Sequence, residues 1–210
     1  MFEEKEFLSE KTGKRLKYFH HSPNIGEKVP LIIYLHGAGS RGDSLSAMAH
    51  VGPIGELEKG RDIPAKIVAP QCSGNTWFEL FETLIDFAET AAAENDVDKS
   101  RIYLTGVSMG SYAAWQLAMT RPTMFAALVA VCGGGMYWNA DRLANMPIWA
   151  FHGALDDIVL PEESIKMVRA VNKNGGNAKI TIFPHADHNA WDPTYALDEM
   201  WDWMFSQSKE

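Results

Sequence analysis

Short apolar runs and amphipathic stretches alternate along most of this 210-residue chain. The apolar runs have the length and composition of buried strands and lie at 30–35, 65–69, 102–105, 126–131, 147–151 and 178–183. Stretches with apolar residues at helical spacing predict helices at 80–94, 109–121, 161–174 and 193–206. Near the start, 2–8 and 16–19 are expected to pair as antiparallel strands about a turn at Thr12-Gly13.

This alternation predicts an α/β fold with a mostly parallel central sheet of about eight strands and helices on both faces. The length fits a single domain over residues 1–210. The connection at 132–146 is short, so we expect a minimal cap or none. In such an open sheet the chemistry is placed where the parallel strands end, at their carboxyl edge.

One stretch has the pattern of a nucleophile elbow. Residues 106–110 read GVSMG, between a strand-type run and a helical repeat that ends at Pro122. A strand that turns at once into a helix brings the backbone close to itself, and Gly106 and Gly110 permit this because they lack a Cβ. We therefore expect Ser108 to stand in a strained turn at the sheet edge as a catalytic nucleophile.

A serine nucleophile needs a histidine base and an acid that orients this histidine. In hydrolases with this elbow the chain order is serine, acid, histidine. Ser108 is followed by Asp156 after the predicted strand at 147–151 and by His188 after the last strand, so these three can meet at one edge. The neighbouring Asp157 competes with Asp156 for the role of the acid. His185 competes with His188.

The histidines differ in their surroundings. His185 directly follows Pro184, which is more typical of an exposed loop, so His188 is favoured as the base. His36 and His152 each precede a glycine at a predicted strand end, and we expect them to orient their turns by hydrogen bonds.

An oxyanion hole needs two N–H donors that point at the developing charge. Met109 follows the nucleophile at a helix N-terminus, where its N–H has no intrahelical partner. The second donor is expected in the glycine-rich turn after the strand at 30–35, and Ala38 is the candidate there.

On these residues the chain resembles the α/β-hydrolase superfamily over nearly its whole length. The matching segments read LHGAG at 35–39, GVSMG at 106–110, FHGALD at 151–156 and DHNAW at 187–191. They are most similar to a peptidase/esterase branch related to prolyl oligopeptidase, dienelactone hydrolase, acyl-protein thioesterase and carboxylesterase. In that branch the acid stands four residues after the histidine of the His-Gly pair, which selects Asp156. A tryptophan soon after the last histidine selects His188, although Asp187 replaces the glycine that commonly precedes it.

The resemblance implies a serine hydrolase of carboxylic esters that acts through an acyl-enzyme. A serine peptidase of prolyl oligopeptidase type is an alternative, and so is a non-catalytic ligand-binding protein of the same fold. The short connection favours short-chain, carbohydrate-linked or aromatic acyl groups. Trp77-Phe78, Met136-Tyr137-Trp138 and Trp191 fall in loops near the active edge and are expected to form an aromatic wall for an acyl group or a sugar ring. Trp77, Trp138 and Trp191 are the substrate-binding candidates among them.

The composition excludes several classes of binding partner. A net charge of −8 argues against nucleic acid or an anionic membrane, and no apolar stretch approaches the length of a membrane span. The start of the chain lacks an apolar signal core, so a cytoplasmic location is expected. Cys72 and Cys132 are expected to be buried free thiols, and no spacing of zinc or phosphate-loop type indicates a metal or cofactor. The expected partner is a small-molecule or saccharide ester. The oligomeric state is left open.

Overall fold

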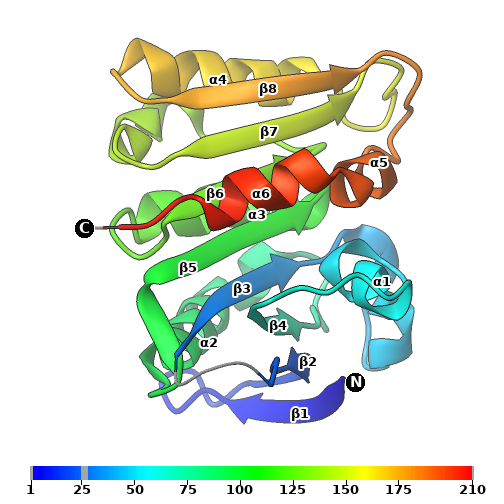
Figure 1. Ribbon diagram of the computed structural model, residues 1–210, viewed down its shortest axis with the longest axis vertical. Coiled ribbons are helices and arrows are strands. Elements are labelled where there is room, and N and C mark those ends of the chain that lie inside the picture. Colours follow the sequence, from blue (N-terminus) through cyan, green and yellow to red (C-terminus); the bar gives the residue numbers. More distant parts are fainter. Residues whose placement is uncertain (1, 25–27, 210) are drawn as a thin grey trace.

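The computed structural model describes residues 2–24 and 28–209 and has the α/β architecture that the sequence predicts. In this part of the chain eight strands form one sheet in the order β1-β2-β4-β3-β5-β6-β7-β8 (Figure 1). The strands are β1 (Glu3–Leu8), β2 (Arg15–His21), β3 (Val29–Leu35), β4 (Lys66–Pro70), β5 (Val97–Val107), β6 (Ala127–Val131), β7 (Ile148–Gly153) and β8 (Ala178–Phe183).

The sheet is parallel from β4 to β8 and antiparallel at its β1 end. The pairs β1–β2 and β2–β4 are antiparallel, whereas β3, β4, β5, β6, β7 and β8 run in one direction. The central strands β3 and β6 are buried along their whole length because helices cover both faces. The carboxyl ends of six strands therefore meet at one edge of the sheet.

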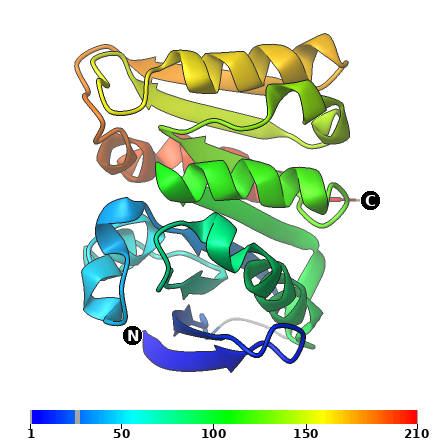
Figure 2. The ribbon, with the colours of Figure 1, turned by 180° about the vertical axis from the view of Figure 1, so that it is seen from behind.

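Helices cover the two faces in separate groups. One face packs against α2 (Phe81–Ala93), α3 (Met109–Thr120) and α4 (Glu162–Lys173), which lie in front of the sheet in Figure 2. The opposite face packs against α1 (Gly52–Glu58), α5 (Trp191–Ala196) and α6 (Asp198–Phe205). Short 3₁₀ helices lie in the connections: η1 (Ala38–Ser40), η2 (Leu45–Met48), η3 (Trp77–Leu80) and η4 (Tyr137–Leu143).

The predicted helix at 80–94 is confirmed by α2, with η3 directly before it. Two other helical predictions need correction. The helix predicted at 193–206 is divided into α5 and α6, because the backbone at Leu197 is extended. The helix α1 was not predicted: its first two residues, Gly52 and Pro53, are typical of a loop, but proline also fits the first turn of a helix.

The connection between β6 and β7 contains η4 and forms no separate cap, as its length predicts. Within the described ranges, none of the helices is long and apolar enough to cross a membrane.

Candidate active site

Ser108 stands between the last residue of β5 and the first residue of α3. Its backbone conformation is one that residues other than glycine rarely adopt. Its φ is 51° and its ψ is −120°, and such strain costs on the order of 1–3 kcal/mol. The turn is tight because a Cβ on Gly110 would lie 2.0 Å from the carbonyl oxygen of Leu35. The helix α3 thus packs directly on the end of β3, and the strained turn expected from GVSMG is present.

The structure brings Ser108, Asp156 and His188 together from three loops at the carboxyl edge. His188 Nε2 lies 2.9 Å from Ser108 Oγ, and His188 Nδ1 lies 2.7 Å from Asp156 Oδ2. The competing residues Asp157 and His185 are both exposed. This geometry places a hydroxyl, an imidazole and a carboxylate in one chain of hydrogen bonds, which is the arrangement that activates a serine.

Glycine at the end of β7 permits the close approach of the loop that carries His188. A Cβ on Gly153 would lie 2.1 Å from the carbonyl oxygen of Asp187 and 2.4 Å from that of Ala186. The loop after β8 is thus held against the end of β7. The side chain of Asp187 accepts a hydrogen bond from the N–H of Asn189.

Asp156 is buried, but it is well supplied with hydrogen-bond donors. Its Oδ1 accepts from the N–H groups of Ile158 and Val159 at 3.0 Å and 2.9 Å, and its Oδ2 faces His188. Burial alone would raise the pKa of Asp156, but the hydrogen bonds from His188 and from these two N–H groups outweigh it and lower the pKa below its ordinary value. The carboxylate is therefore ionised at neutral pH and is able to orient His188.

A second histidine also approaches the carboxylate. The Nε2 of His152 lies 3.1 Å from Asp156 Oδ2 and 2.8 Å from the carbonyl oxygen of Val159. Both of these groups are acceptors, so this nitrogen carries the proton. The other ring nitrogen lies 2.7 Å from the hydroxyl of Ser164. The turn-orienting role expected of His152 therefore extends to Asp156 itself, which the sequence did not indicate.

The turn after β3 lies against the nucleophile. A Cβ on Gly37 would lie 3.4 Å from Ser108 Cβ, and Ala38 is the first residue of η1. Met109 is the first residue of α3, so neither N–H has a partner within its own helix. Arg41 fixes this turn, since its guanidinium donates to the carbonyl oxygens of Ala38 and Asn75 at 2.8 Å and 2.9 Å. Ala38 and Met109 thus flank Ser108 as predicted, and their donor role stays a prediction.

His36 stabilises this turn by hydrogen bonds to backbone groups. Its Nδ1 donates to the carbonyl oxygen of Gly37 at 2.7 Å, and its Nε2 accepts from the N–H of Cys72 at 2.9 Å. Burial lowers the pKa of His36 to about 4, so the ring is neutral at physiological pH. The structure agrees with the expectation that His36 orients its turn.

The three tryptophans lie in different environments, and the prediction that Trp77 contacts the substrate is wrong. Its side chain is fully buried, its ring lies 5.1 Å from that of His36, and its Nε1 donates to the carbonyl oxygen of His36. Trp77 is a core residue and no substrate reaches it. Trp138 is exposed, whereas Trp191 is partly buried with its ring edge-on to His188 at 5.5 Å.

Both cysteines are buried free thiols, as predicted. Burial raises the pKa of Cys132 to about 12, so its sulfur is protonated at neutral pH. The sulfur lies within 4.8 Å of ligand atoms of Asp156 and His188, and among the described residues this is the one set with metal-ligand spacing. Because the carboxylate and imidazole already bond to each other and the thiol is protonated, the set fits a hydrogen-bonded triad better than a metal site.

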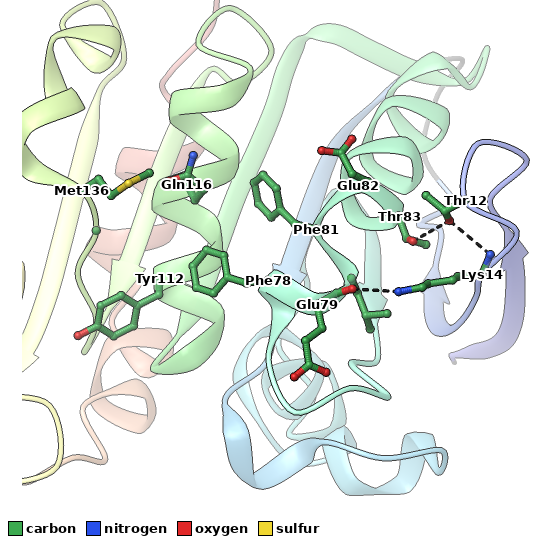
Figure 3. A pocket seen from close by; sticks show the side chains of 12 residues that line it. Thr12, Lys14, Phe78, Glu79, Phe81, Glu82, Thr83, Tyr112, Gln116 and Met136 are labelled. Carbon is green, nitrogen blue, oxygen red and sulfur yellow. Dashed lines mark hydrogen bonds between the residues drawn. The ribbon is translucent and has the colours of Figure 1, made fainter.

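A groove of about 860 Å³ lies beside the candidate site and was not predicted. Figure 3 shows Phe78 and Phe81 on one wall, and Tyr112, Gln116 and Met136 on the other. The walls come from η3, α2, α3 and the segment before η4, which are far apart in the sequence. Only the aromatic content of the stretches at 77–78 and 136–138 pointed to this region.

The comparison with known families decides the relationship that these features suggest. A sequence profile described as "Dienelactone hydrolase family" matches residues 65–196, which is well over half of the chain. The chain belongs to the dienelactone hydrolase family. The match begins one residue before β4 and ends with α5, so it includes Ser108, Asp156 and His188.

The proteins and structures to which this chain is similar are named as hydrolases of several kinds. Over 136 residues the chain is 27% identical to poly(3-hydroxyalkanoate) depolymerase C of Paucimonas lemoignei, which corresponds to 57% of this chain and 31% of that protein. The crystal structure of a thermostable esterase superposes with a TM-score of 0.86 at 29% identity, over 99% of this chain and 63% of that one. The acylaminoacyl peptidase of Pyrococcus horikoshii shares the fold, with a TM-score of 0.67 at 19% identity over 90% of this chain and 38% of that one. The chain therefore spans only part of the length of these proteins.

Proposed function

We propose that this chain is a serine hydrolase that cleaves carboxylic esters through an acyl-enzyme intermediate. The observation that carries the proposal is the chain of hydrogen bonds from Ser108 Oγ to His188 Nε2 at 2.9 Å and from His188 Nδ1 to Asp156 at 2.7 Å. Membership of the dienelactone hydrolase family and the likeness to an esterase structure support hydrolysis as the reaction class. Poly(3-hydroxyalkanoate), the substrate in the depolymerase's name, is itself a polyester.

In the first half of the reaction, Ser108 Oγ attacks the ester carbonyl carbon while its proton passes to His188 Nε2. Asp156 stabilises the imidazolium that forms, because its lowered pKa keeps it ionised. The carbonyl oxygen becomes an oxyanion, which the N–H groups of Ala38 and Met109 stabilise. The C–O bond to the alcohol then breaks, and His188 gives its proton to the leaving oxygen.

In the second half, a water molecule takes the place of the alcohol. His188 removes a proton from this water, which attacks the acyl carbon, and the bond to Ser108 Oγ breaks as the same proton returns to the serine. The products are a carboxylic acid and the free enzyme. Every protein group used in these steps belongs to this chain.

The substrate in this proposal is a small-molecule or saccharide ester with a short-chain or aromatic acyl group. The connection between β6 and β7 forms no cap over the carboxyl edge, so a bulky alcohol such as a sugar has room to project away. Trp191 stands beside His188, where a leaving alcohol departs, and Trp138 is exposed after β6. Both are candidates for contact with the alcohol part.

Turnover of p-nitrophenyl acetate tests the proposal, with Ser108→Ala as the matched variant. We expect the parent protein to release nitrophenol catalytically and Ser108→Ala to lose on the order of 10⁴–10⁶ in kcat, because loss of one triad member disables the unit. A peptide p-nitroanilide is assayed alongside. Faster turnover of the anilide would favour the peptidase alternative, and turnover of neither substrate would favour a ligand-binding protein.

A further inference from the structure

The groove lined by Phe78, Phe81, Tyr112, Gln116 and Met136 begins next to the candidate nucleophile. Tyr112 lies one helical turn after Ser108 on α3, and its N–H donates to the carbonyl oxygen of Ser108 at 3.1 Å. The facing wall also starts near Ser108. Trp77, the residue before Phe78, donates from Nε1 to the carbonyl oxygen of His36 at 3.1 Å, and a Cβ on Gly37 would lie 3.4 Å from Ser108 Cβ. The two walls therefore converge on Ser108.

The position of the groove relative to His188 decides which part of an ester it receives. His188 follows β8, three strands to one side of β5, whereas η3 and α2 follow β4, two strands to the other side. A leaving alcohol must lie within reach of His188, which protonates it. The acyl part of the same ester then extends from Ser108 in the other direction, along α3 and into the groove.

The lining of the groove indicates the chemistry of its occupant. Three aromatic rings and the thioether of Met136 offer contacts that suit a planar ring. The rings of Phe78 and Phe81 lie 6.1 Å apart, and Phe78 is 53% exposed although it is a large apolar side chain. The groove's volume of about 860 Å³ falls in the range of small-molecule sites, and an acetyl group would occupy little of it.

Charged side chains of both signs, Lys14, Glu79 and Glu82, line the far end of the groove (Figure 3). Lys14 Nζ donates to the carbonyl oxygen of Glu79 at 3.0 Å, and the Glu79 carboxylate accepts hydrogen bonds from Asn75. These mixed charges select neither an anionic nor a cationic acyl group. The aromatic rings nearer Ser108 favour an uncharged one, because a charge placed among them would lose its hydration.

We infer that this groove binds the acyl part of the substrate, and that this acyl part is an uncharged aryl-alkanoyl group such as 3-phenylpropanoyl. The inference rests on the proposed ester hydrolysis and makes that proposal specific. In this inference Phe78, Phe81, Tyr112 and Met136, on the α2–α3 side of the nucleophile, contact the acyl group. Trp138 and Trp191 contact the alcohol part.

The test compares kcat/KM for p-nitrophenyl 3-phenylpropanoate and p-nitrophenyl acetate, which share one leaving group. In the parent protein we expect the phenylpropanoate to be preferred at least tenfold. Phe78→Ala and Met136→Ala remove one side chain from each wall, and each is expected to lower this ratio about tenfold through the kcat/KM for the phenylpropanoate. Tyr137→Ala is the matched control, since Tyr137 is a neighbouring aromatic residue that is similarly exposed at 46% and lies outside the groove.

Acetate turnover by the parent separates the two proposals. If acetate is hydrolysed but the ratio does not respond to Phe78→Ala and Met136→Ala, the groove assignment is wrong and the esterase proposal stands. A ratio that falls in Trp138→Ala instead would move the acyl group to the other side. If no ester is hydrolysed, binding of neutral 3-phenylpropanamide is measured by NMR line broadening. If Phe78→Ala weakens this binding about tenfold, the assignment of the acyl group to the groove is supported. If the variant binds as tightly as the parent, or if neither protein binds, the assignment is overturned.

Discussion

Two parallel strands end in the same dipeptide, His-Gly, and the two histidines have different partners. His36 after β3 and His152 at the end of β7 are both fully buried. Among the described residues, the ring of His36 hydrogen-bonds to backbone groups alone, those of Gly37 and Cys72. The ring of His152 bonds to the Ser164 hydroxyl and lies 3.1 Å from the Asp156 oxygen that also faces His188.

This difference explains how one short pattern serves two purposes. Each histidine fixes the turn in which its strand ends, but only the turn after β7 contains the acid four residues later. His36 thus contributes to the shape of the turn that carries Ala38, whereas His152 acts on the carboxylate that orients His188. Variants of the two turns should therefore separate into those that change catalysis and those that change stability.

The largest effect is expected at the acid itself. Asp156→Asn should lower kcat about 10⁴-fold, because an asparagine favours the wrong tautomer of His188. Asp157→Asn alters an exposed carboxylate next to it and should leave kcat within about twofold. Steady-state kinetics of both variants on p-nitrophenyl acetate measure this, and the reverse ranking would assign the acid to Asp157.

A smaller catalytic effect is expected at His152. His152→Asn removes the nitrogen that faces Asp156, and a hydrogen bond to a charged group is worth about 1.5–3 kcal/mol, so kcat should fall about 10–100-fold. His152→Gln carries an amide N–H near the Nε2 position and should retain most of the activity.

The KM for a small ester and the melting temperature distinguish positioning from simple destabilisation. Both His152 variants lose buried contacts and should melt at similar temperatures with similar KM. If kcat were also equal in the two, His152 would have no effect through Asp156.

At His36 the expected effect concerns stability. Because burial lowers its pKa from 6.5 to about 4, the unfolded chain binds a proton between these values that the folded chain does not bind. Stability that is present above about pH 6.5 is therefore lost as the pH falls, by about 2 kcal/mol between pH 7 and pH 5.

Urea unfolding of the parent and of His36→Asn at both pH values measures this loss. We expect His36→Asn to be less stable at pH 7 but to lose about 2 kcal/mol less on acidification. An equal pH dependence in both proteins would mean that His36 does not titrate as its burial implies.

Apart from the triad, whose distant members the motifs and the family resemblance select, the sequence mainly predicts features that depend on residues close together in the chain. The strained turn at Ser108 follows from two glycines around a serine, and the spacing of His152 and Asp156 follows from one strand end. Trp77 was misplaced because its ring position depends on His36, which lies 41 residues away. The groove was missed for a similar reason: its walls come from segments that only the folded sheet brings together.

Covalent labelling tests the central claim, that Ser108 is a nucleophile activated by His188. The protein is treated with a fluorophosphonate, whose fluoride an activated serine displaces to form a stable phosphonyl ester, and the labelled peptide is sequenced by mass spectrometry. We predict a single label on Ser108 that is absent in Ser108→Ala and forms at least 10³-fold more slowly in His188→Ala. A label on another residue, or ester turnover that persists in the parent without labelling of Ser108, would contradict the account.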